Sequence, residues 1–250
     1  MADITSKYDG NVSNEGQVNW RGDQVSVVQG GQSIYDSSTV QLADLGSRKV
    51  VGDRVFRYAK SKGAIGAGMT CQYGGETLSS TAVAASSASN INIFTITAAT
   101  AIVKDTYAEG YLLCVAGATD SNVGMIYKIK SQALGSSAGT CKLTLYDEIK
   151  EVIRLTSTWS VYQNPYINVD TSTANGAALG VCPIDLTTGD YFWLQTWGPA
   201  CVGASAAAGT AIVNSVSGLA TLMAAAGYPI GVAAALETGG NTLVFLTVAP

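Results

Sequence analysis

The chain of 250 residues contains no histidine, and only 13% of its residues are charged. Histidine is the commonest general base and the commonest metal ligand in proteins. Its absence excludes Ser-His-Asp and Cys-His catalytic arrangements as well as the common zinc sites. We therefore expect no catalytic, cofactor-binding or metal-binding residues, and we interpret the chain as a structural protein and not as an enzyme.

Other catalytic patterns are weak. The densest acidic cluster is Asp147, Glu148 and Glu151, but glycoside chemistry needs two carboxyls on opposite sides of a bond, which neighbours on one short segment rarely provide. A solvated face is favoured instead. The glycine-rich residues 63–68 lack the helix and lysine of a phosphate-binding loop, so they predict a turn.

Charged residues normally make up about a quarter of a protein, so this chain has few with which to cover its surface. Serine, threonine, asparagine, glycine and alanine must cover the remainder, which favours a subunit of an obligate assembly. The net charge of −4 and the sequence pI near 4.8 argue against direct binding of nucleic acid.

The chain has no C-x-x-C pair, and its five cysteines are widely spaced: Cys71, Cys114, Cys141, Cys182 and Cys201. This pattern predicts free, buried thiols in a protein made in a reducing cytoplasm. The first residues lack the basic and apolar regions of a signal peptide. Residues 219–236 are too rich in alanine, glycine and proline for a membrane helix, so no membrane partner is expected.

Residues 1–40 are polar and rich in Gly, Asn, Ser, Asp and Gln. We expect an extended N-terminal arm that becomes ordered along a neighbouring molecule. The tripeptide Arg21-Gly22-Asp23 matches a cell-adhesion signal, but a charged turn is favoured because three residues recur by chance.

From residue 50 onward, short β-branched and aromatic runs alternate with turn residues. Residues 41–250 therefore predict an all-β body, an antiparallel β-sandwich or a β-barrel-like fold, with a possible inserted β subdomain at about 75–200. Residues 111–116, 125–130 and 141–146 predict a meander, preceded by a strand at 91–97. Residues 230–236 and 242–248 predict a closing hairpin.

Three regions are less regular. Residues 74–90 predict a loop, and residues 147–154 predict a short amphipathic helix or, equally, a strand connection. Residues 200–235 predict strands of small side chains in preference to a helix. In residues 191–197, Tyr191, Trp193 and Trp197 share one face while Phe192 and Leu194 share the other, which predicts a central or interfacial strand.

Two groups of segments carry a resemblance to a known family. Leu45-Gly46, Arg54-Val-Phe-Arg-Tyr58 and Ala64-Ile-Gly-Ala-Gly68 combine a glycine-led strand, an aromatic strand and a small-residue turn. This combination resembles the core pattern of the tailed-bacteriophage capsid decoration, or cement, proteins. Segments that look like virion structural proteins of similar phages are Gly110-Tyr-Leu-Leu-Cys-Val115, Ile126-Tyr-Lys-Ile-Lys130, Leu143-Thr-Leu-Tyr-Asp147, Asn164-Pro-Tyr166 and Tyr191-Phe-Trp-Leu-Gln-Thr-Trp-Gly-Pro199. The chain is longer than the small decoration proteins.

The resemblance implies an all-β homotrimer on the capsid outer surface that binds the major capsid protein and carries no active site. It implies a protein made in the host cytoplasm and incorporated into the virion. A tail-tube, connector or fibre component is an alternative, since those proteins are also β-rich and charge-poor. A carbohydrate-binding or receptor-binding module is a further alternative, in which Trp193 and Trp197 stack on sugars, although core or interface roles are favoured for these aromatics.

Overall fold

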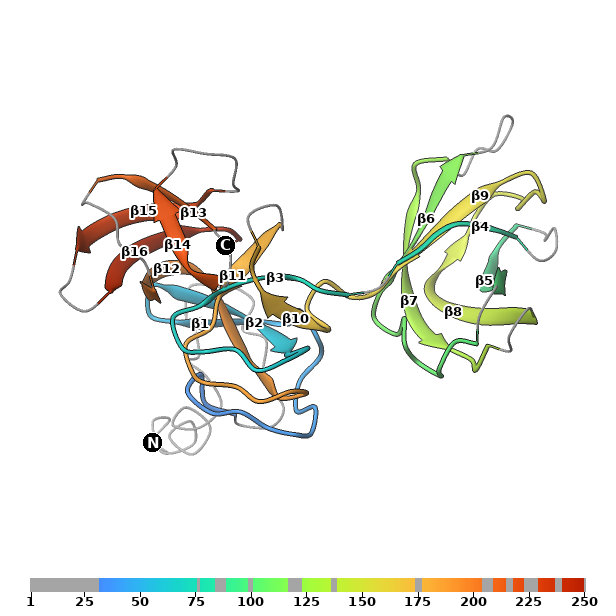
Figure 1. Ribbon diagram of the computed structural model, residues 1–250. Coiled ribbons are helices and arrows are strands. Elements are labelled where there is room, and N and C mark those ends of the chain that lie inside the picture. Colours follow the sequence, from blue (N-terminus) through green and yellow to red (C-terminus); the bar gives the residue numbers. More distant parts are fainter. Residues whose placement is uncertain are drawn as a thin grey trace, which may run out of the picture. The chain divides into compact units, whose positions relative to one another are not determined.

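A computed structural model divides the chain into two compact units. Unit 1 comprises Met1–Gly74 and Tyr166–Pro250, and unit 2 comprises Gly75–Pro165. The structure describes residues 32–75, 77–83, 89–98, 101–116, 123–135, 139–173, 177–203, 209–214, 218–222, 229–236 and 240–249. These residues form antiparallel β-sheets and no α-helix (Figure 1), which confirms the predicted all-β fold class.

Unit 1 is built around one large sheet. Its strands are β1 (Arg48–Val51), β2 (Arg54–Lys60), β3 (Thr70–Tyr73), β10 (Val169–Thr171), β11 (Ala178–Val181), β12 (Tyr191–Gly203), β13 (Ala211–Asn214), β14 (Ala220–Leu222), β15 (Pro229–Leu236) and β16 (Asn241–Thr247). The main order is β10-β3-β11-β12-β16-β15-β13-β14, and β2 joins β1 to β12.

Strand β12 is central, as its apolar pattern predicts. Phe192 and Leu194 lie in one buried cluster, whereas Trp193 lies in another with Phe56 and Tyr58 of β2. The first half of β12 pairs with β2 and the second half with β16. The halves meet near Gly198, which has a φ of +84° and where a Cβ would lie 2.3 Å from the Asp53 carbonyl oxygen. Only glycine fits this close approach.

Unit 2 contains β4 (Thr77–Ala82), β5 (Ile91–Ala98), β6 (Tyr111–Ala116), β7 (Ile126–Gln132), β8 (Gly139–Ile149) and β9 (Thr158–Tyr162). Their order is β4-β9-β6-β7-β8-β5, so the predicted meander β6-β7-β8 is confirmed. The sheet curls into a barrel-like shape (Figure 1), and its two end strands approach through a bridge between Val83 and Ile96. The Thr97 hydroxyl also donates to the Ala82 carbonyl at 3.1 Å.

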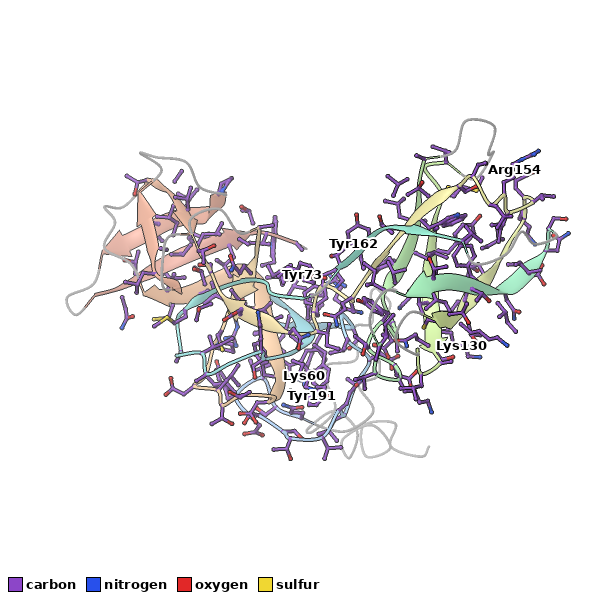
Figure 2. The ribbon with its side chains drawn as sticks, turned by 45° about the vertical axis from the view of Figure 1, so that its right-hand side comes forward. Lys60, Tyr73, Lys130, Arg154, Tyr162 and Tyr191 are labelled. Atoms are coloured by element: carbon purple, nitrogen blue, oxygen red, sulfur yellow. The ribbon has the colours of Figure 1, made fainter. Side chains whose placement is uncertain are left out.

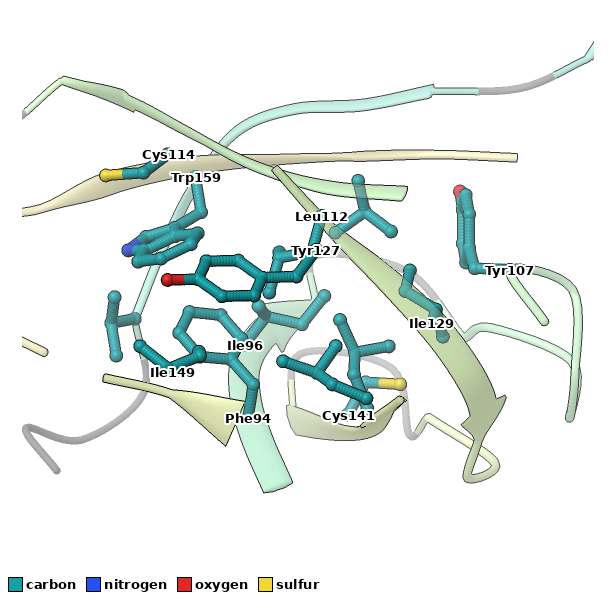
Figure 3. Close-up of a cluster of buried hydrophobic side chains, with 14 of the residues drawn as sticks. Phe94, Ile96, Tyr107, Leu112, Cys114, Tyr127, Ile129, Cys141, Ile149 and Trp159 are labelled. Carbon is teal, nitrogen blue, oxygen red and sulfur yellow. The ribbon is translucent and has the colours of Figure 1, made fainter. Parts of the chain in front are cut away.

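One core fills unit 2 (Figure 3). Trp159 is fully buried, and its ring centroid lies 4.7 Å from that of Phe94. Tyr127 and Ile129 point inward while Lys128 and Lys130 are exposed, so β7 has one buried and one exposed face over these residues. Apolar side chains at every second position give a strand one apolar face, which is sufficient to place it against a core.

Unit 2 is inserted between β3 and β10 of unit 1, and these two strands pair with each other, with Val169 opposite Tyr73. Its boundaries are residues 75 and 165. Residues 166–200 of the expected insertion lie in unit 1, because β10, β11 and β12 pair within the unit 1 sheet.

The prediction of a loop for residues 74–90 is wrong, since β4 pairs with β9 over part of this range. Of the two alternatives for residues 147–154, a short helix or a strand connection, the structure has the second: β8 continues to Ile149, which pairs with Ile91 of β5. Pairing with a neighbouring strand outweighs the helical spacing of a segment this short. The predicted hairpin of β15 and β16 is confirmed, as is the strand structure of the described residues in 200–235.

Candidate interaction surface

Three neighbouring strands of unit 1, β12, β16 and β15, form a sheet with two different faces. Side chains of one face lie in a buried cluster that includes Val202, Val244 and Leu246. Gly231 brings β15 close to β16, since a Cβ there would lie 2.1 Å from the Phe245 carbonyl oxygen. A packed inner layer thus supports these strands from one side.

The opposite face, here named the outer face, consists of Trp197, Pro199, Cys201, Val232, Leu243 and Phe245. The exposed fractions of its large side chains are 37% for Trp197, 43% for Val232, 40% for Leu243 and 51% for Phe245. Strand register places Pro199 opposite Phe245 and Phe245 opposite Val232. Cys201 lies opposite Leu243 in the next row. Phe245 is therefore the centre of a contiguous apolar surface.

The outer face carries no charge. Strands β12, β15 and β16 contain no Asp, Glu, Lys or Arg, and the only charged residue between positions 191 and 250 is Glu237. Isolated exposed apolar residues are normal on a protein surface, but a contiguous apolar patch marks a contact site. Depletion of charge combined with aromatic residues is the composition of an interface core.

Trp193 and Trp197 do not form a common platform. Trp193 is fully buried, and its Nε1 donates to the Gln32 carbonyl at 3.2 Å. A bulge between Gln195 and Trp197 shifts the register of β12, and Trp197 emerges on the surface. The alternative in which both rings stack on a sugar is wrong, because the ring of Trp193 has no accessible surface.

Residues 32–40, the last part of the expected arm, pack against the body, with Gln32 and Ile34 buried. The Gln32 carbonyl also accepts a hydrogen bond from Lys49 Nζ at 2.8 Å. The Gln32 side chain accepts from Tyr58 Oη at 2.8 Å and donates to the Tyr191 carbonyl at 2.9 Å. Ser38 bridges to Tyr191. The remaining arm residues, 1–31, including Arg21-Gly22-Asp23, lie outside the described residues.

Aromatic rings and cations surround this attachment of Gln32, here named the Gln32 anchor. Lys49 Nζ lies 5.1 Å from the Trp193 ring centroid, and burial lowers the pKa of its ammonium group. Lys60 Nζ lies 5.2 Å from the ring centroid of Tyr191 (Figure 2). Such cation–π contacts add attraction to the hydrogen bonds. The Gln32 anchor therefore fixes the point where the chain enters the body.

The other expected features are placed as follows. Asp147, Glu148 and Glu151 are exposed, and Lys150 Nζ lies 2.9 Å from Glu148 Oε2, so the acidic cluster is a solvated face. No group of Cys, Asp and Glu within the described ranges could hold a metal ion. The glycine-rich residues 63–68 form turns and a bridge from Ile65 to Leu186, with no helix after them.

All five cysteines are free, and four are buried as predicted. Cys201 is the exception, because its position on the outer face exposes it. Burial raises the pKa of the Cys71 thiol and raises that of Cys182 to about 12. The thiols of Cys71 and Cys182 are therefore protonated and unreactive at neutral pH.

Comparison with known proteins gave no match to any protein family, to any curated protein or to any solved structure. In the part of the chain that the structure describes, no helix has the length and apolar character needed to span a membrane.

The outer face was missed by sequence reasoning. Two signals could have revealed it: residues 243–246 are apolar at four successive positions, and charge is nearly absent after residue 190. A strand that buries one face and still carries Leu243 and Phe245 on the other has more apolar surface than its own core uses.

Proposed function

We propose that the chain is a capsid decoration, or cement, protein of a tailed bacteriophage. It binds the exterior of the expanded capsid and stabilises contacts between major capsid protein subunits, without catalysis. The observation that carries this proposal is the outer face, a charge-free apolar surface in a chain with few charges anywhere. The resemblance of residues 45–68 to decoration proteins supports the same function.

Cement proteins act mechanically, and this role requires only an interface of ordinary size from each copy. A standard interface of about 1,000–2,000 Å² per contact is sufficient, because many copies on a symmetric shell share the load. A chain of two β-units with well-packed cores suits this role, since rigid bodies lose little entropy on attachment.

We assign part of the attachment to the capsid to the polar residues 1–31, in addition to contact through the outer face. Gln32, the residue that follows this segment, accepts hydrogen bonds from side chains of three strands. Residues 1–31 are therefore joined to a fixed point on the body. A polar segment of this kind binds by adding a strand to a neighbouring sheet edge or by lying in a groove.

The test is to mix the purified chain with emptied, expanded phage shells and to measure occupancy by cryo-electron microscopy. Density at three-fold or two-fold positions of the capsid is the expected result. Deleting residues 1–31 lowers occupancy at least tenfold while the circular dichroism spectrum of the body is retained. The matched control replaces residues 1–31 by a Gly/Ser segment of the same length, and it too fails to bind.

Bare shells with the intact chain would contradict the proposal. Binding along the tail axis would favour the tail-tube, connector or fibre alternative. Unchanged occupancy after deletion of residues 1–31 would overturn the assignment of attachment to the arm.

A further inference from the structure

We propose that unit 2 binds an acidic polysaccharide on its solvent-facing surface, along a row of side chains that crosses four neighbouring strands. The row, here named the tyrosine row, consists of Tyr162, Tyr111, Lys128 and Tyr146. This activity goes beyond the proposed function, which assigns contact with the capsid to the outer face of unit 1 and to residues 1–31.

Strand register places the members of the tyrosine row side by side. Tyr162 of β9 lies opposite Tyr111 of β6, and Tyr111 lies opposite Lys128 of β7. Lys128 Nζ lies 5.7 Å from the ring centroid of Tyr146 of β8. Since neighbouring strands are about 4.8 Å apart, the row extends over about 15 Å of the sheet. A site of this length suits a chain molecule better than a single small ligand.

The tyrosine row faces solvent because the residues next to it in sequence fill the core. One sequence neighbour of each member is buried in the core of unit 2: Val161, Leu112, Tyr127 and Leu145. Successive side chains of a strand point to opposite sides of the sheet. Tyr146 is accordingly 55% exposed, Tyr162 and Lys128 are exposed, and Tyr111 is half-buried. The core of unit 2 is therefore complete without the three tyrosine rings of the row.

Exposed tyrosines have two properties that a sugar requires of a binding surface. The flat face of the ring packs against the apolar C–H face of a sugar, and the phenolic hydroxyl exchanges hydrogen bonds with sugar hydroxyls. Because tyrosine has only two side-chain dihedral angles, it provides a large contact area at a small loss of conformational entropy. Leucine or valine would provide apolar area without hydrogen bonds. Three tyrosines in one row therefore favour a ligand rich in hydroxyls over an apolar one.

Lysines give the surface around the tyrosine row a preference for acid groups. Lys130 (Figure 2) lies two positions after Lys128 on the same side of β7. Lys142 lies four positions before Tyr146 on the same side of β8. All three lysines are exposed. Carboxylates of a bound chain form charge-assisted hydrogen bonds with their ammonium groups.

Acidic residues close to the row limit how much negative charge the ligand carries. Glu148 lies two positions after Tyr146, and Lys150 Nζ lies 2.9 Å from its Oε2. Asp147 is exposed beside it, and Glu109 is half-buried just before β6. A single-stranded nucleic acid has a phosphate at every residue and requires a continuous basic groove. Lysines interspersed with acidic residues instead fit a polysaccharide in which only some sugars carry a carboxylate.

The experiment measures the affinity of the full chain for fragments of hyaluronan and of xanthan, in which only some sugars carry a carboxylate, by isothermal titration calorimetry. Binding to at least one of them is expected, with an affinity that falls as the salt concentration rises. Dextran, which has no carboxylate, is expected to bind at least about tenfold more weakly. Equal or tighter binding of polyglutamate or of oligo-dT would overturn the inference, since these polymers offer negative charge without a polysaccharide.

Variants test whether binding takes place on the tyrosine row. Tyr146→Ala removes an exposed ring and is expected to weaken binding by about tenfold. Tyr146→Phe keeps the ring and is expected to weaken binding by only about threefold, through the loss of one hydrogen bond. Tyr162→Ala provides a second variant should Tyr146→Ala fail to fold. Lys128→Gln is expected to weaken binding and to make the affinity less sensitive to salt.

Matched controls come from unit 1. Tyr35→Ala removes a tyrosine that is 57% exposed, close to the value for Tyr146, and Lys62→Gln removes an exposed lysine. Both variants are expected to bind like the wild type. Absence of binding to both polysaccharides would overturn the inference. So would an equal loss of affinity in Tyr35→Ala and Tyr146→Ala.

The outcomes separate this inference from the proposed function. A chain that decorates capsids but binds neither polysaccharide overturns the site on unit 2 and leaves the cement role intact. A chain that binds through the tyrosine row and leaves shells bare supports the site and contradicts the cement role.

Discussion

In unit 2 the buried apolar side chains form one core, whereas unit 1 divides its own among three buried clusters. Both units also expose large apolar side chains, among them Ile126 in unit 2 and Phe245 in unit 1. The exposed positions of unit 2 include charged side chains as well, among them Lys130 and Arg154 (Figure 2). Ile126 thus shares its strand face with lysines, whereas Phe245 lies on a β12-β16-β15 face that has no charged residue.

The comparison teaches that charge is low throughout this chain and lowest on one sheet. Unit 2 has 13 charged residues among 91 positions, close to the 13% of the whole chain, whereas positions 191–250 have one. Interaction surfaces are therefore better sought from the distribution of charge along a chain than from its total.

The largest expected effects are losses of unfolding free energy from substitutions in the core of one unit at a time. Trp159→Ala in unit 2 and Trp193→Ala in unit 1 each remove a fully buried ring and cost about 3–5 kcal/mol of unfolding free energy. Each variant is expected to lower the unfolding midpoint of its own unit only. Denaturant titration followed by two-dimensional NMR measures this, and a shift of both units together would show that they unfold as one.

A smaller effect is expected in the pH dependence of the stability of unit 1. In the unfolded chain the thiols ionise near pH 9.0, whereas burial keeps Cys182 protonated until about pH 12. Above pH 9.0 the unfolded state therefore binds fewer protons, and the stability of unit 1 falls as pH rises towards 12. Cys182→Ala is expected to make this decline shallower in urea titrations between pH 8 and pH 11. An unchanged slope would contradict the role of the thiol.

Lys49 has the opposite effect on the pH dependence of the stability of unit 1. Burial lowers its pKa, so the unfolded state binds more protons between that lowered value and 10.5, and the stability contributed by this group rises with pH. Lys49→Met is therefore expected to steepen the alkaline decline of unit 1. This provides a control in which the slope moves in the other direction.

The hydroxyl of Tyr58 makes two hydrogen bonds, and their loss is expected to have a smaller effect than loss of a buried ring. Tyr58→Phe removes the bond that Tyr58 Oη donates to Gln32 Oε1 and the bond that it accepts from the Leu42 N–H, and is expected to lower the stability of unit 1 by about 1–3 kcal/mol. Thermal and urea unfolding measure the change. A transition of unit 2 that shifts as well would contradict the separation of the units.

The smallest effect on unit 1 is expected from removing unit 2. Val169 and Tyr73 pair across β3 and β10, so the chain ends left by excising residues 75–165 already lie together. Joining Gly74 to Tyr166 through a short Gly-Ser linker should leave the unfolding midpoint of unit 1 nearly unchanged. Loss of a cooperative transition would show that unit 1 depends on its insertion.

The elements that could be predicted from the sequence are those defined by local signals. The meander of β6, β7 and β8 and the hairpin of β15 and β16 follow from alternation and turn residues within short windows. The helical spacing of residues 147–154 was misleading, because the pairing of Ile149 with Ile91 depends on a strand far earlier in the chain.

The contacts of the site depend on long-range partners that local patterns do not report. The local sequence predicts that Gln32 is part of a polar arm. In the structure its side chain donates a hydrogen bond to the carbonyl of Tyr191, which lies 159 positions away. The bulge in β12 that separates Trp193 from Trp197 has no marker in the run of aromatics. The position of the outer face required the strand register.

The Gln32 anchor also determines how the body bears force. Its hydrogen bonds come from Lys49 of β1, Tyr58 of β2 and Trp193 of β12, three strands that pair in succession. Tension applied to the chain before Gln32 therefore loads three adjacent strands simultaneously and does not peel one edge strand from the sheet. A molecule attached through its N-terminal segment would resist pulling with the strength of its central sheet.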